Sequence, residues 1–86
     1  MVKIKFVLRD VPEDQRVKII DTITLNDSIG KVKGLVRKAY SINQLFTIML
    51  MHAGTVLETK KLVKDYDLSS GKVVVSLIKT SEMRGD

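Results

Sequence analysis

Two stretches near the start of the chain have the composition and alternation of strands. In residues 2–8, lysines separate apolar positions, which predicts a strand. Its inward side chains are predicted to be Val2, Ile4 and Phe6. Residues 17–25 are rich in Val, Ile and Thr and predict a second strand, with a bulge where the pattern slips between Ile19 and Ile20. The acidic, proline-containing residues 10–14 predict a loop, so the two strands form a hairpin.

A helical period follows this hairpin. Ser28 is the predicted N-cap, because the apolar periodicity starts at Ile29. The apolar face consists of Ile29, Val32, Val36 and Ala39. The opposite face carries Lys31, Lys33, Arg37 and Lys38. This amphipathic pattern predicts a surface helix that ends at residues 41–44.

The stretch 48–54 is apolar on both sides of a predicted strand, which then turns through Ala53 and Gly54. Because successive side chains of a strand point to opposite faces, Ile48 and Leu50 face one way. Met49 and Met51 face the other way. Such a strand is either covered on both faces or leaves one face as an exposed apolar patch.

The rest of the chain predicts a short edge strand at 55–58, an irregular segment and a final strand at 73–78. We expect one domain over residues 1–79 and a flexible tail at 80–86. The order strand, strand, helix, strand, short strand, strand predicts an α+β fold. Its helix packs across one face of a mixed sheet of four to five strands, which is the β-grasp arrangement.

The composition is typical of a soluble globular protein, with 44% hydrophobic and 29% charged residues. The sequence contains no cysteine, which excludes disulfides, zinc–thiolate sites and cysteine nucleophiles. No apolar run approaches the roughly 20 residues of a membrane span, and the first residues lack the apolar segment of a signal peptide. We therefore expect an intracellular protein, in the cytoplasm or the nucleus, with no membrane partner.

The net charge of +5 suggests nucleic-acid binding, because lysine and arginine neutralise phosphates. The lysines, however, are scattered along the whole chain. The few aromatic residues also lack the clustering of a base-stacking platform. Nucleic-acid binding through the helix cations is therefore the less favoured hypothesis.

Candidate catalytic residues are sparse. His52 is the single histidine, and no Gly-x-Ser-x-Gly elbow accompanies it. Gly71-Lys72 lacks the glycine spacing of a phosphate-binding loop, and the His or Cys clusters that metal binding needs are missing. We expect no enzyme activity, no cofactor and no metal, and a packed or edge position for His52.

Three motifs in combination carry a family resemblance. They are Ser28-Ile29-x-x-Val32-Lys33, Leu50-x-His52-Ala53-Gly54-x-x-Leu57-Glu58 and Leu62-Val63-x-Asp65-Tyr66-Asp67-Leu68. With these, the chain resembles ubiquitin and its relatives from Val2 to about Lys79. The helix sequence Ile29-Gly30-Lys31-Val32-Lys33-Gly34-Leu35 is also similar to the ubiquitin-like domains of tubulin-folding cofactors. The resemblance implies a β-grasp interaction module of proteasome, chaperone or cofactor pathways.

The chain departs from the conjugated members of that family at its end. Their terminal Gly-Gly would fall at Glu82 and Met83, whereas here Gly85 is followed by Asp86. The chain-linking lysine that follows Ala-Gly in the family is Thr55 in this sequence. The resemblance therefore implies a non-conjugated module. A covalent modifier or a sulfur-carrier protein is the alternative, and it requires C-terminal processing.

The resemblance also implies that the open sheet face docks protein partners, including helical ubiquitin-binding or chaperone-type motifs. Met51 matches the central position of that face, with Met49 beside it. For the last strand, family spacing places Val75 and Leu77 on the open face, whereas hydrophobicity alone would bury them. We follow the spacing. The predicted partner-binding residues are Met49, Met51, Val75, Leu77 and Lys79. Burial of the two methionines by the tail or by a partner subunit is the alternative.

Overall fold

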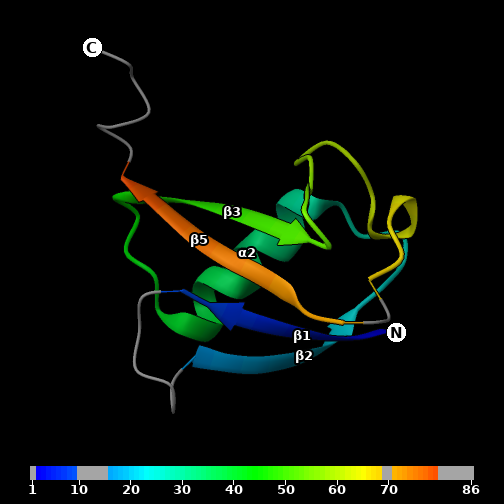
Figure 1. Cartoon of the computed structure of the whole chain (residues 1–86), viewed down its shortest axis with the longest axis horizontal. Coiled ribbons are helices and arrows are strands. Elements are labelled where there is room, and N and C mark those ends of the chain that lie inside the picture. Colours follow the sequence, from blue (N-terminus) through cyan, green and yellow to red (C-terminus); the bar gives the residue numbers. More distant parts are fainter. Residues whose placement is uncertain (1, 10–15, 69–70, 80–86) are drawn as a thin grey trace.

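A computed structural model describes residues 2–9, 16–68 and 71–79, and its framework is one mixed sheet (Figure 1). Strand β1 (Val2–Leu8) pairs antiparallel with β2 (Val17–Ile23) and parallel with β5 (Val73–Lys79). Strand β3 (Phe46–His52) pairs antiparallel with β5 and with β4 (Thr55–Val56). The five-stranded order is β2-β1-β5-β3-β4. Among the described residues one α-helix, α2, lies behind the strands, and this arrangement confirms the predicted α+β fold of the β-grasp type.

The β1–β2 hairpin contains the irregularity that the sequence predicts, but closer to the end of β2. Ile4 is opposite Ile20, whereas Val2 is opposite Ile23, so the register shifts after Ile20. The extra residue in β2 lets both Ile20 and Ile23 pack toward the core. Residues 10–14, which are predicted to form the connecting loop, lie outside the described residues.

Helix α2 (Ile29–Tyr40) starts where its N-cap residue predicts. The Ser28 hydroxyl accepts a hydrogen bond from the Lys31 N–H at 3.1 Å, which confirms Ser28 as the cap. At the other end, Ser41 adopts a left-handed conformation with φ 54°, and its N–H bonds back to the last turn. Ile29, Val32 and Val36 are buried, so the amphipathic face lies against the sheet as predicted.

The core lies between α2 and one face of the sheet. Its members are Ile4, Phe6, Leu8, Ile23, Ile29, Val32, Val36, Ile48, Leu50, Leu57, Val63, Leu68, Val73 and Val75. Ile48 and Leu50 are therefore on the covered face, in agreement with the prediction. The short helix η1 (Val63–Asp65) adds Val63, and the Asp65 carboxylate accepts the Leu62 N–H at 2.9 Å as a capping group.

The predicted orientation of the last strand is wrong. Val75 is 0% exposed and lies directly opposite Leu50, and Leu77 packs against the same core opposite Ile48. Lys79 follows on this side of the strand, opposite Phe46. Hydrophobic burial decides the register here, because the opposite facing would put Ser76 into the core in place of Val75.

The described residues contain neither a membrane-spanning helix nor a cluster of metal-ligating side chains. None of their helices is long and apolar enough to cross a membrane. In the same part of the chain, no three His, Cys, Asp or Glu side chains come together as metal ligands. The predicted tail, residues 80–86, is not among the described residues.

Candidate docking surface on the open sheet face

One apolar row crosses all five strands on the face that α2 does not cover. Lateral pairing places side by side Val17 of β2, Val7 of β1, Val74 of β5, Met51 of β3 and Val56 of β4. Laterally paired residues project from the same face of a sheet, and their neighbours Leu50 and Val75 point into the core. We call these five side chains the open-face row.

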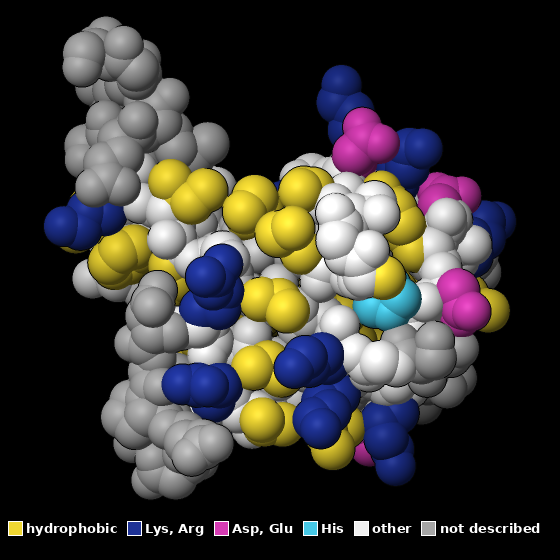
Figure 2. Space-filling view, in the orientation of Figure 1, with side chains coloured by type: hydrophobic (Ala, Val, Ile, Leu, Met, Phe, Trp, Pro, Cys, Tyr) yellow, Lys and Arg dark blue, Asp and Glu magenta, His cyan; other side chains and the backbone are white. Residues whose placement is uncertain are grey.

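The middle of the open-face row forms the floor of a hollow of about 530 Å³. Its lining consists of Val7, Arg9, Arg16, Met51, Ala53, Gly54, Lys72 and Val74. The lining thus combines three apolar side chains of the row with three cationic residues, and the described residues that line it include no Asp or Glu. Figure 2 shows this face, with basic side chains among the apolar ones and most acidic side chains of the described residues toward the right-hand margin.

The cations reach the hollow because of where the strands end. Arg9 directly follows β1, and its N–H donates to the Val75 carbonyl at 3.1 Å, which extends the β1–β5 pairing by one residue. Lys72 directly precedes β5, after Gly71 in a left-handed conformation with φ 76°. Arg16 directly precedes β2. Since strand alternation buries Leu8 and Val73, the adjacent Arg9 and Lys72 project from the open face.

Tyr40 fixes the start of β2 from the helix side. Its hydroxyl lies 2.7 Å from the Arg16 carbonyl, to which it donates, and 3.2 Å from the Phe6 carbonyl. The Lys18 ammonium lies over the same ring, 5.6 Å from its centroid. Burial raises the pKa of Tyr40, so the phenol stays protonated and keeps its donor. The backbone that carries Arg16 to the hollow is thus anchored to α2.

A tight turn shapes the other side of the hollow. His52 pairs with Thr55, and the two residues between them, Ala53 and Gly54, have φ values of 50° and 82°. Two consecutive positive φ values are typical of the type I′ turn that closes a two-residue hairpin. The predicted turn at Ala53 and Gly54 is confirmed, and it brings both residues to the edge of the hollow.

Of the predicted partner-binding residues, only the methionines face the open side. Met51 lies in the hollow, and Met49 is partly buried beside it, opposite Ser76. The Ser76 hydroxyl is buried and has no hydrogen-bond partner among the described residues. Val75 and Leu77 belong to the covered face, as described above, and exposed Lys79 is at the end of the same side.

Sequence reasoning missed the remainder of this surface. Val7 is not among the predicted partner-binding residues, although it is the apolar exception among Lys3, Lys5 and Arg9 on the polar side of β1. This apolar exception is the feature of the sequence that could identify Val7 as part of an exposed apolar surface. Nothing in the sequence brings Arg9, Arg16 and Lys72 together, because their proximity depends on the pairing of β1 with both β2 and β5.

The helix cations form a different kind of surface, because most of them have intramolecular contacts. Lys31 pairs with Asp27 at 3.1 Å, and Lys33 donates to the Thr59 hydroxyl at 2.7 Å. Partial burial lowers the pKa of Lys33. The Arg37 guanidinium donates to the carbonyls of Asn43 and Phe46 at 2.8 and 2.9 Å. These cations therefore fasten the helix to its neighbouring loops.

His52 lies at the end of β3, partly buried and opposite Val73, beside Gly71. This is the edge position that the sequence predicts. Comparison with known proteins gives no assignment, since no family model and no curated protein matches the chain.

Proposed function

We propose that this protein is a non-catalytic, ubiquitin-like interaction module that docks protein partners through its open sheet face. The observation that carries the proposal is the hollow in the open-face row, where Val7, Val74 and Met51 meet a rim of cations. Methionine suits a docking role because its flexible, polarizable side chain adapts to different apolar partners.

The charge of the rim indicates the chemistry of the partner. Arg9, Arg16 and Lys72 line the hollow, and no Asp or Glu of residues 2–9, 16–68 and 71–79 lines it with them. A partner segment that inserts an apolar side chain and carries carboxylates beside it matches both features. An amphipathic helix with acidic residues next to its apolar face has this pattern, and it is consistent with the family resemblance.

The test uses a defined peptide. A fluorescein-labelled amphipathic helical peptide with a leucine face and flanking glutamates is titrated with the protein, and binding is followed by fluorescence polarisation. We expect Met51→Asp to weaken binding by about tenfold or more, since it places a carboxylate on the floor of the hollow. Leu25→Asp is the matched control, because Leu25 is an exposed apolar residue outside the hollow. Circular dichroism verifies that both variants are folded.

A charge swap tests the rim. Lys72→Glu is expected to weaken binding of the glutamate peptide and to improve binding of a matched peptide with flanking lysines. Lys64→Glu, an exposed cation on η1, should change neither. The proposal fails if Met51→Asp binds the glutamate peptide as tightly as the parent protein does.

The nucleic-acid hypothesis receives less support from these contacts. Lys31, Lys33 and Arg37 would have to leave their present partners before they could neutralise phosphates. Retention on a nucleic-acid column at low salt, with a steep loss as salt rises, would favour that hypothesis over protein docking.

A further inference from the structure

The two edges of the sheet differ in length. The edge strand β4 has two residues, whereas the edge strand β2 has seven. In the described part of the chain, the only strand neighbour of β2 is β1. An edge strand presents outward N–H and C=O groups in a row, which is a template for pairing with another strand. Short edges are one way in which proteins avoid such pairing, and β2 is not short.

The side chains of β2 also favour pairing. Ile19 is 59% exposed and Val17 is 45% exposed, and both project from the open face beside Lys5 and Val7. A lysine on an edge strand normally discourages pairing. Here Lys18 is opposite Phe6 on the helix side, with its ammonium over the Tyr40 ring. Lys18 therefore does not hinder strand pairing on the open-face side of β2, where Val17 and Ile19 project.

We propose that β2 pairs antiparallel with β2 of a second copy of this chain, about a two-fold axis at Ile19. This register sets Ile19 against its own copy and Lys18 against Ile20 of the second copy. An axis at Lys18 would place two lysines directly opposite each other, which is destabilising. An axis at Ile20 would pair the partly buried Ile20 with itself and place the exposed Ile19 opposite Asp21, whereas the axis at Ile19 places the less exposed Val17 opposite Asp21. Pairing at Ile19 joins the most exposed apolar side chain of the strand to an identical one.

The dimer is expected to be weak and reversible. Regular pairing is confined to the part of β2 before the register shift that follows Ile20. An interface of this length falls below the roughly 1,000 Å² of stable complexes. The two-fold axis is perpendicular to the sheet, so both open faces point the same way. Each dimer then offers two hollows on one side, which increases avidity for a partner with two docking segments.

Sedimentation velocity on the full chain over a range of concentrations tests the proposal. The parent protein is expected to move from the monomer mass of 9.7 kDa toward the dimer as its concentration approaches about 1 mM. Ile19→Lys should raise the dimer dissociation constant by about tenfold or more. Val56→Lys is the matched control, because Val56 is a similarly exposed apolar residue (47%) on the opposite edge. It should leave the dimer unchanged.

The register is tested with single cysteines, which this cysteine-free chain permits without other changes. Spin labels on Ile19→Cys should be closest together in the dimer, and labels on Val17→Cys should lie about 13 Å farther apart along the strands. Three results would overturn the proposal. They are a monomer at all concentrations, a dimer that Val56→Lys disrupts and Ile19→Lys does not, or label distances shortest at Val17.

Discussion

The two faces of this sheet are made of similar side chains and differ in what surrounds them. In β3, Leu50 is buried under α2, whereas the next residue, Met51, lies in the hollow of the open face. In β5, Val75 and Val74 repeat this contrast. Apolar character alone therefore does not separate the core from the candidate docking surface. The presence of a covering helix on one face, and of a cationic rim on the other, separates them.

The largest expected effect comes from introducing a carboxylate on each face of β5 in turn. Val75→Asp places a carboxylate in the core with no partner, and we expect it to cost more than about 4 kcal/mol of unfolding free energy and to unfold the domain. Val74→Asp, one residue earlier and beside the basic rim, should cost about 1 kcal/mol. Urea denaturation followed by circular dichroism measures both. If the two variants lose the same amount of unfolding free energy, Val74 and Val75 are equally buried and β5 does not separate a covered face from an open one.

Truncation in β3 gives an intermediate effect. Leu50→Ala removes a fully buried side chain and leaves a cavity, so we expect a loss of about 2–5 kcal/mol. Met51→Ala removes a partly exposed side chain, and the loss should stay below about 1 kcal/mol. Its effect should appear in binding of the glutamate-flanked peptide. A Met51→Ala variant as unstable as Leu50→Ala would place Met51 in the core and contradict the docking surface.

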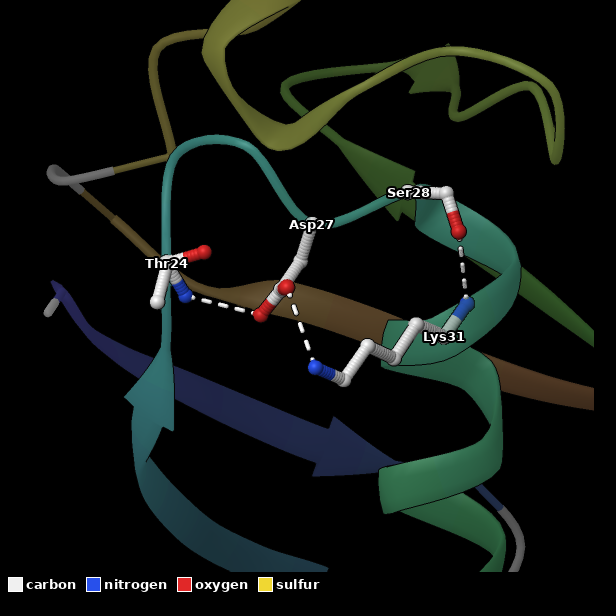
Figure 3. Close-up of polar contacts among 4 residues, drawn as sticks. All are labelled: Thr24, Asp27, Ser28 and Lys31. Carbon is white, nitrogen blue, oxygen red and sulfur yellow. Dashed lines mark hydrogen bonds and ion pairs between the residues drawn. The ribbon is translucent and has the colours of Figure 1, made fainter.

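The smallest expected effect is on acid stability, and it concerns the loop between β2 and α2. The Thr24 N–H donates to the Asp27 carboxylate at 2.9 Å and Lys31 donates to it at 3.1 Å (Figure 3), and these contacts lower the pKa of Asp27. A lowered folded pKa means that this stabilisation is complete above the ordinary carboxyl pKa of about 3.9. It is lost as the pH falls through the lower, folded value.

The measurement is the urea midpoint at pH 7 and again below pH 3. Asp27→Asn should narrow the difference between these two midpoints, because the amide does not titrate. Asp21→Asn is the control, since Asp21 is an exposed carboxylate on the edge strand β2. If the two variants respond to pH alike, the contacts of Asp27 do not contribute to the acid sensitivity.

The sequence by itself determined the elements and most of the core. Alternation at Ile4 and Phe6, the helical period from Ile29 and the cap at Ser28 all depend on local spacing. Local spacing can be interpreted from the sequence alone, because the backbone geometry of a helix or strand determines which side chains share a face. The strand order then follows from connection rules, which leave few arrangements for a hairpin, a helix and further strands.

Only the tertiary structure decided the facing of β5 and the composition of the hollow. Both choices for β5 left apolar residues on each side, so local alternation could not choose between them. Pairing with β3 determines the facing of β5, because it places Val75 beside Leu50 on the face that the helix covers. The rim of Arg9, Arg16 and Lys72 likewise requires three strand ends to meet at one place. Residues so far apart in sequence become neighbours only through strand pairing, which no local pattern records.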